Sequence, residues 1–193
     1  TILEGIAEKK YLELVTSGKK HSEEKIKLYP IKLYVSTQNG REYVLGHVSG
    51  ASGLDFIRVD RIKKVKTGIR CGEYQKFENE YQASKSYLWG VSSGNAKDIT
   101  HIEMTVRAAE GEEFIVRRLE REKRNGHVYK ITDQQYKYVV DTYDAMELMP
   151  WIRTFMGRIE KLESSNPQLK KKFDQDMEQL YSMYFGEAQN DIS

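Results

Sequence analysis

The stretch from Gly40 to Lys66 constrains this chain more than any other, because it combines two predicted β-strands with arginines in unusual positions. Residues 41–48 mix aromatic and β-branched side chains, and a glycine-rich turn follows them. Residues 54–65 then alternate, which places Arg58 and Arg61 on opposite faces of one predicted strand. A fully buried strand would not carry arginine, and a half-exposed strand would carry charge on one face only. The arginines are therefore either solvated or salt-bridged at a strand end, or they bind an anion through their guanidinium groups.

The same stretch resembles the core of a WYL domain, a small Sm-like β-barrel found in bacterial transcription regulators and defence-associated proteins. Residues 57–62, IRVDRI, closely match the arginine-rich strand motif of that family. The tripeptide that names the family matches at Tyr43, whereas Glu42 and Val44 stand where tryptophan and leucine are usual. Asp55 stands where a further arginine is common. The resemblance implies a barrel fold and a ligand-binding surface on it.

The distribution of charge suggests two domains. The formal net charge is +2 over 193 residues. Residues 1–98 hold 17 Lys/Arg and 12 Asp/Glu, hence +5, and the remainder holds 14 and 17, hence −3. The asymmetry either arises by chance or places an anion-facing surface on the first half. The best linker is residues 91–95, VSSGN, which divides the chain into predicted domains at 1–94 and 95–193.

The first predicted domain is a small β-barrel with a short N-terminal linker helix. Five short strands, each bounded by turn residues, favour a barrel over an open sheet. Pro30 lies within the second strand, which predicts an edge strand or a bulge. Residues 73–87 form a predicted helix, whose aromatic stripe (Tyr74, Phe77, Tyr81) packs on the barrel.

The second predicted domain has the order βαββαβ followed by one more helix, which is the ferredoxin-like pattern within an α+β fold. A helix is expected over residues 112–123, with Phe114 and Leu119 on its weak apolar stripe. Asn166 and Pro167 predict the N-terminus of the last helix, which ends near Gly186. One face of that helix is expected to point inward: Leu169, Phe173, Met177, Leu180 and Tyr184.

This half also resembles the C-terminal extension that WYL regulators often carry. An acidic-aliphatic helix runs into Pro150 and Trp151, and Gly157 precedes the fourth strand, as in that extension. The N-terminal winged helix-turn-helix of such regulators is missing, so contact with duplex DNA would require a domain outside this chain. We also expect the chain to form a homodimer.

No catalytic constellation, metal site or cofactor motif is visible, so we expect neither an enzyme nor a cofactor. The four histidines have no ligand spacing, and Cys71 has no histidine near it in sequence. A single cysteine, no signal peptide and no apolar run long enough to span a membrane point to the cytoplasm.

Two functions remain open. The barrel would either bind a nucleotide or short single-stranded nucleic acid as the sensor of a transcription regulator, or serve as a protein-interaction module without a small ligand. In the first case Tyr43 would stack on or hydrogen-bond the ligand, and Arg58 and Arg61 would bind phosphate. His47, Ser49 and Lys63 would complete the site. In the second case the arginines would pair with Glu42, Asp55 or Asp60 inside the fold.

Overall fold

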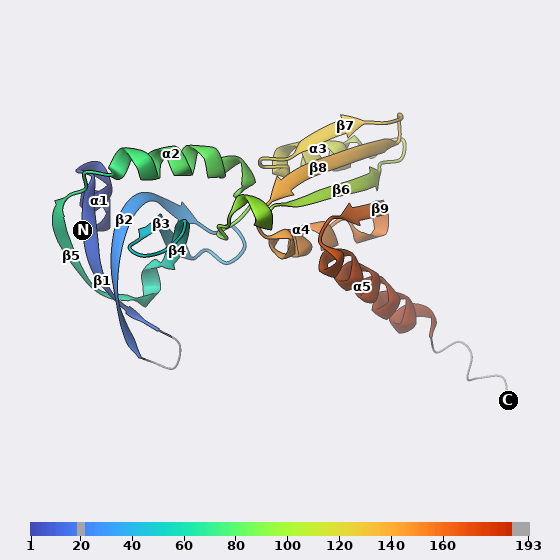
Figure 1. Cartoon of the computed structure of the whole chain (residues 1–193). Coiled ribbons are helices and arrows are strands. Elements are labelled where there is room, and N and C mark those ends of the chain that lie inside the picture. Colours follow the sequence, from blue (N-terminus) through green and yellow to red (C-terminus); the bar gives the residue numbers. More distant parts are fainter. Residues whose placement is uncertain (19–21, 187–193) are drawn as a thin grey trace. The chain divides into compact units, whose positions relative to one another are not determined.

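The computed structural model describes residues 1–18 and 22–186, and the chain divides into two compact units, Thr1–Asp98 and Ile99–Ser193 (Figure 1). Each unit is an α+β structure built on one antiparallel sheet.

The first unit contains a five-stranded sheet in the order β4-β3-β2-β1-β5. Its strands β4 and β5 form the two edges, and no hydrogen-bonded ladder joins them within the described ranges. A closed barrel, which the sequence predicted, is therefore not found, because a 3-10 turn connects β4 to β5 in place of strand pairing. The elements are α1 (Ile2–Ala7), β1 (Lys10–Ser17), β2 (Glu23–Val35), β3 (Glu42–Val48), β4 (Leu54–Arg58), η2 (Val59–Arg61), β5 (Ile62–Arg70), α2 (Tyr74–Ser84) and η3 (Lys85–Tyr87).

The turn η2 corrects the prediction of one continuous strand over residues 54–65. The strand ends at Arg58, and the backbone turns through Val59–Arg61 before β5 begins. Arg58 and Arg61 consequently do not lie on opposite faces of one strand.

Both faces of β3 are buried, each in a different core. Val44 packs with Leu12, Leu14 and Leu28 on one side of the sheet. Leu45 packs on the other side with residues of α2, among them Phe77 and Tyr81. The aromatic stripe of α2 is buried as the sequence predicted, and it packs on the face of the sheet that carries Leu45.

Strand β2 is central, and the Pro30 prediction is resolved as a bulge. The register between β2 and β3 shifts between Pro30 and Lys32, where proline cannot donate to the ladder. Gly46 lies directly opposite Pro30. A Cβ added at Gly46 would lie 2.2 Å from the carbonyl oxygen of Tyr29, so only glycine allows the two backbones to approach this closely.

The second unit contains a four-stranded sheet in the order β7-β8-β6-β9. Ile102, Met104 and Val106 of the central strand are buried against the helices, and alternate residues face the other way. The elements are η4 (Ala96–Asp98, at the end of the first unit), β6 (Thr100–Arg107), α3 (Glu113–Glu122), β7 (His127–Lys130), β8 (Gln135–Thr142), η5 (Ala145–Leu148), α4 (Met149–Arg153), η6 (Met156–Arg158), β9 (Ile159–Ser164) and α5 (Pro167–Phe185).

Two predicted apolar faces of this unit are confirmed only in part. In α3 the buried residues are Ile115 and Leu119, whereas Phe114 is exposed. In α5 only Leu169 and Phe173 are buried. The inward face predicted for the rest of α5 is exposed, because its C-terminal half extends beyond the sheet that covers the first two turns (Figure 1).

The N-terminus of α5 is as predicted. Asn166 caps the helix by accepting a hydrogen bond from the backbone N–H of Gln168, and Pro167 occupies the first turn. Within the described ranges, every helix is too short or too polar to traverse a lipid bilayer.

Candidate functional site

The candidate site lies at the end of β4, where three arginines surround one carboxylate. Arg58 donates to Asp60 through Nε at 3.0 Å and through Nη2 at 2.6 Å. These hydrogen bonds, together with the charges of Arg58, Arg41 and Arg61, hold the pKa of Asp60 below its ordinary value. The carboxylate in turn raises the pKa of Arg58. Three guanidinium groups against one carboxylate leave two positive charges at the site.

The ladder of the sheet puts two tyrosines in line with this cluster. Tyr34 of β2 pairs with Tyr43 of β3, and Tyr43 pairs with Arg58 of β4. Directly paired residues lie on the same face of a sheet, so the three side chains form one row. We call this row, together with Arg41, Asp60 and Arg61, the arginine site.

Aromatic contacts support the row from within. Phe56 meets Tyr43 edge-on at 6.3 Å and Tyr34 at 5.3 Å between ring centroids. The hydroxyl of Tyr34 lies 3.1 Å from that of Tyr81 on α2, and burial raises the pKa of Tyr34. This contact fixes Tyr34 against the helix. Tyr43 is half-buried and is paired with Arg58.

His47 lies elsewhere, beneath α2. Its ring stacks on Phe77 at 4.1 Å with an interplanar angle of 13°, and its side chain is 16% exposed. The nearest carboxylate, of Glu80, is 3.8 Å from Nδ1, and Nδ1 has no hydrogen-bond partner in the described residues. His47 therefore belongs to the packing between β3 and α2.

Ser49 and Lys63 make contacts with residues other than the arginines. Ser49 follows β3, and its backbone N–H donates to the carbonyl of Lys27. Lys63 lies on β5, at the opposite edge of the sheet, where its ammonium contacts Glu23 of β2 at 3.2 Å. Tyr43 and Arg58 are thus paired in the sheet and Arg61 lies near Asp60, whereas the contacts of His47, Ser49 and Lys63 are with other residues.

Sequence reasoning missed Arg41 and Tyr34. Both flank the turn between β2 and β3. The position of Tyr34 beside Tyr43 follows from the register of the β2–β3 hairpin. That register depends on the bulge at Pro30, which the alternation of residues alone does not reveal. Glu42 and Asp55, the other proposed partners of the arginines, make no ion pair in the described part of the chain, whereas Asp60 does.

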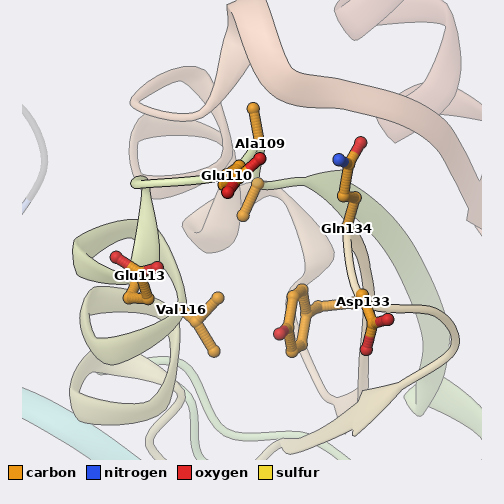
Figure 2. A pocket seen from close by; sticks show the side chains of 8 residues that line it. Ala109, Glu110, Glu113, Val116, Asp133 and Gln134 are labelled. Carbon is orange, nitrogen blue, oxygen red and sulfur yellow. The ribbon is translucent and has the colours of Figure 1, made fainter.

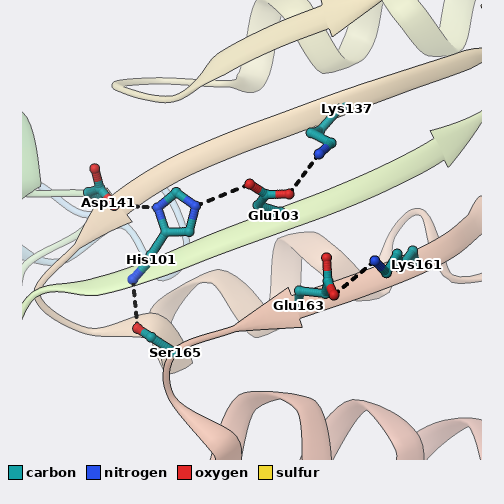
Figure 3. Close-up of polar contacts among 7 residues, drawn as sticks. All are labelled: His101, Glu103, Lys137, Asp141, Lys161, Glu163 and Ser165. Carbon is teal, nitrogen blue, oxygen red and sulfur yellow. Dashed lines mark hydrogen bonds and ion pairs between the residues drawn. The ribbon is translucent and has the colours of Figure 1, made fainter. Parts of the chain in front are cut away.

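The second unit carries a polar network on the face of its sheet opposite the buried residues (Figure 3). His101 contacts Asp141 through Nδ1 at 2.7 Å and Glu103 through Nε2 at 3.3 Å. Lys137 donates to Glu103 at 2.8 Å. The two carboxylates raise the pKa of His101, the hydrogen bond to Asp141 contributing most. No group of three or more potential metal ligands is found among the described residues.

A pocket of about 290 Å³ lies at the end of α3 and the β7–β8 turn (Figure 2). Glu110, Glu113 and Asp133 make its rim acidic, and Asp133 is held by Lys130 at 2.7 Å.

In the first unit, burial raises the pKa of Cys71, which disfavours the thiolate that nucleophilic chemistry needs. The arginine site is therefore the best-supported candidate for binding an anion.

Comparison with known proteins bears on the fold. No protein-family model matches the sequence, and no curated protein matches it. Among solved structures, the chain is similar to a CRISPR Cas-related protein at 12% identity and a TM-score of 0.58, over 97% of this chain and 50% of that one. It also aligns with proteasome accessory factor B/C (PafBC) of Arthrobacter aurescens at 13% identity and a TM-score of 0.42, over 95% of this chain and 26% of that one.

The chain spans half or less of the length of each of these proteins. At 12% identity the likeness to the CRISPR Cas-related protein shows a shared fold.

Proposed function

We propose that this chain is the ligand-sensing region of a bacterial transcription regulator, and that its first unit binds a nucleotide or a short single-stranded nucleic acid at the arginine site. The observation that carries the proposal is the row Tyr34–Tyr43–Arg58, which ends in a cluster of three arginines around Asp60. A guanidinium fork suits phosphate, and an aromatic face beside it suits a base.

Electrostatics favours an anionic ligand there. Arg61 and Arg41 are exposed, and neither side chain has an ion-pair partner in the part of the chain that the structure describes. Arg58 is engaged by Asp60 but keeps 24% of its side chain exposed. A phosphate can therefore bind Arg41 and Arg61 directly, with Arg58 shared between the ligand and Asp60.

The architecture is consistent with the WYL resemblance. We propose that the five-stranded sheet is an Sm-like barrel left open between β4 and β5. The order β7-β8-β6-β9, with the chain order βαββαβ, supports a ferredoxin-like second unit. In this proposal any contact with duplex DNA would come from a domain outside the chain.

Thermal denaturation with ATP and with a short oligo(dT) tests the proposal, because a ligand of the folded state raises stability by mass action. We expect both probes, or one of them, to raise the Tm of the wild type. Arg58→Ala and Arg61→Ala should abolish the shift, whereas Arg70→Ala, which removes an exposed arginine at the end of β5, should keep it. An unchanged shift in the Arg58 and Arg61 variants would refute the site.

A second candidate function, a protein-interaction module that forms a homodimer, is favoured by α5. The last two turns of this helix expose Tyr181, Met183, Tyr184 and Phe185, each by 63–73%. Such clustered apolar surface commonly marks an interaction site. If sedimentation shows a dimer that Met183→Ser with Tyr184→Ser dissociates, and no nucleotide or oligonucleotide raises the Tm, this second function replaces the first.

A further inference from the structure

The edges of the two sheets differ in how well they suit a second copy of the chain. Within the described ranges the edge strands are β4 and β5 in the first unit and β7 and β9 in the second. An edge strand presents backbone N–H and C=O groups with which another strand can pair. When two copies of an edge pair around a two-fold axis perpendicular to the sheet, each residue meets a residue from the same face of the other copy. The charges along the edge therefore decide whether a strand can pair with itself.

Three of these edges are unsuited to pairing with themselves. Strand β5 holds four basic residues and no acidic one, and register shifts interrupt its pairing with β1 at two places. Strand β7 has no acidic residue either. In β4 the opposite charges of Asp55 and Arg58 are three positions apart, so they lie on opposite faces and cannot meet across the axis. Lysines and bulges at sheet edges commonly prevent association.

The edge strand β9, by contrast, is self-complementary. Its ladder with β6 is regular from Lys161 to Ser164. Lys161 and Glu163 lie on the solvent face, to either side of the buried Leu162, and contact each other at 2.9 Å (Figure 3). Their side chains are 64% and 52% exposed. A two-fold axis through Leu162 would place each Lys161 opposite Glu163 of the other copy, and such cross-strand pairs of opposite charge stabilise a sheet.

The surroundings of Glu163 favour a further cation. Glu163 is paired with Glu103 of β6 on the same face of the sheet. Like charges directly opposite each other on neighbouring strands are destabilising. Lys137 of β8 already contacts Glu103 at 2.8 Å. A lysine from a second copy would add a positive charge on the other side of this carboxylate pair.

The last helix points to the same edge. Leu169 and Phe173 of α5 are buried, and the same helical stripe continues, exposed by 36–73%, as Met177, Leu180, Tyr181 and Tyr184. Figure 1 shows the helix leaving the second unit on the β9 side of the sheet, away from β7. Residues 174–185 of α5 span about 18 Å, which exceeds three strand spacings of about 4.8 Å. The exposed stripe is therefore long enough to lie beneath strands that a second copy would add to β9.

We infer that two copies of this chain pair through β9 around a two-fold axis at Leu162. The pairing joins the two four-stranded sheets into one continuous sheet and places the exposed part of each α5 beneath the other copy. The inference rests on the second candidate function, the homodimer, and adds the strand and the charge pairs that form its interface. It involves no residue of the arginine site.

Charge reversal followed by sedimentation equilibrium of the full chain tests the pairing. Lys161→Glu and Glu163→Lys should each raise the dissociation constant of the dimer about tenfold, because two attractive pairs become repulsive. The double variant, Lys161→Glu with Glu163→Lys, restores opposite charges and should dimerise like the wild type. For the same reason, a mixture of the two single variants should form a heterodimer more tightly than either variant pairs with itself.

Lys130→Glu is the matched control, because it makes the same charge change on β7, the other edge of the same sheet. It should dimerise like the wild type. The double variant also shows that the two exposed positions tolerate substitution without loss of fold. A wild type that sediments as a monomer at every concentration would overturn the inference, and so would single variants that keep the wild-type dissociation constant.

The outcomes separate this interface from the two proposed functions. If Met183→Ser with Tyr184→Ser dissociates the dimer and the charge reversals do not, the β9 pairing is wrong while dimerisation through α5 stands. Ligand binding is judged separately, by the Tm shifts with ATP and oligo(dT), which depend on residues of the first unit.

Discussion

The guanidinium of Arg58 donates two hydrogen bonds to the carboxylate of Asp60 across the 3-10 turn that ends β4. The two residues are only two positions apart, so the pair stabilises the turn itself. It also sets the charge of the arginine site, because Asp60 competes with any anion for Arg58.

Asp60→Asn should therefore increase the affinity of the arginine site for ATP several-fold. The substitution removes a negative charge next to Arg41, Arg58 and Arg61 and leaves a side chain of the same size. Isothermal titration of the wild type and the variant measures the change. Asp55→Asn, on the preceding strand, is the control and should have a smaller effect, since among the described residues the Asp55 carboxylate accepts a hydrogen bond only from the N–H of Phe56. Weaker binding by the Asp60 variant would show that Asp60 orients Arg58 for the ligand.

Gly46→Ala should destabilise the first unit by about 1–3 kcal/mol, the usual cost of forcing extra atoms into a packed interior. The added Cβ would meet the carbonyl oxygen of Tyr29 at 2.2 Å, and backbone cannot move aside as a side chain can. Urea denaturation followed by circular dichroism gives the free energy of unfolding. Gly72→Ala is the matched control, because nothing lies within 4 Å of a Cβ there. Equal stability of the two variants would contradict the close approach at the bulge.

The two halves of α5 should respond differently to truncation. Phe173→Ala removes a ring that is 8% exposed and should cost about 3–5 kcal/mol. Phe185→Ala removes one that is 63% exposed and should change the free energy of unfolding by less than about 0.5 kcal/mol. Chemical denaturation at low protein concentration measures both. A large effect of Phe185→Ala would mean that the end of the helix is covered in solution.

The stability of the second unit should depend on pH through His101. Asp141 and Glu103 raise the pKa of His101 in the folded state, so folding favours its protonated form. The resulting stabilisation is complete below about pH 6.5, the ordinary value for histidine, and disappears as the pH rises through the folded pKa. Since the ring is 49% exposed, the effect should not exceed about 1 kcal/mol.

The measurement compares the wild type with His101→Gln by urea denaturation between pH 5 and pH 8, the range in which histidine titrates. The wild type should lose its advantage over the variant as the pH rises. His127→Gln, which removes an imidazole from the edge strand β7 of the same sheet, serves as the control. A difference between the wild type and His101→Gln that stays constant with pH would exclude the ion pairs as its source.

By itself, the sequence determined the order of the elements and the local features that begin and end them. The stripe of Tyr74, Phe77 and Tyr81 and the Asn166 cap were predicted, because helical periodicity and capping act within a few residues. At Pro30 the missing N–H predicted an edge strand or a bulge, and the structure has the bulge. The three arginine-site residues singled out, Tyr43, Arg58 and Arg61, lie together in the structure.

Only the tertiary structure decided how these features combine. Alternation predicted one strand through Arg58 and Arg61, but the bond to Asp60 closes a turn there. Periodicity gave α5 one continuous apolar face, but how much of it is buried depends on where the sheet ends. Lys25 and Lys64 are far apart in sequence, and both neighbour Val15 because of the register of the sheet. Contacts between distant strands are set by the packing of the whole unit, which no local pattern records.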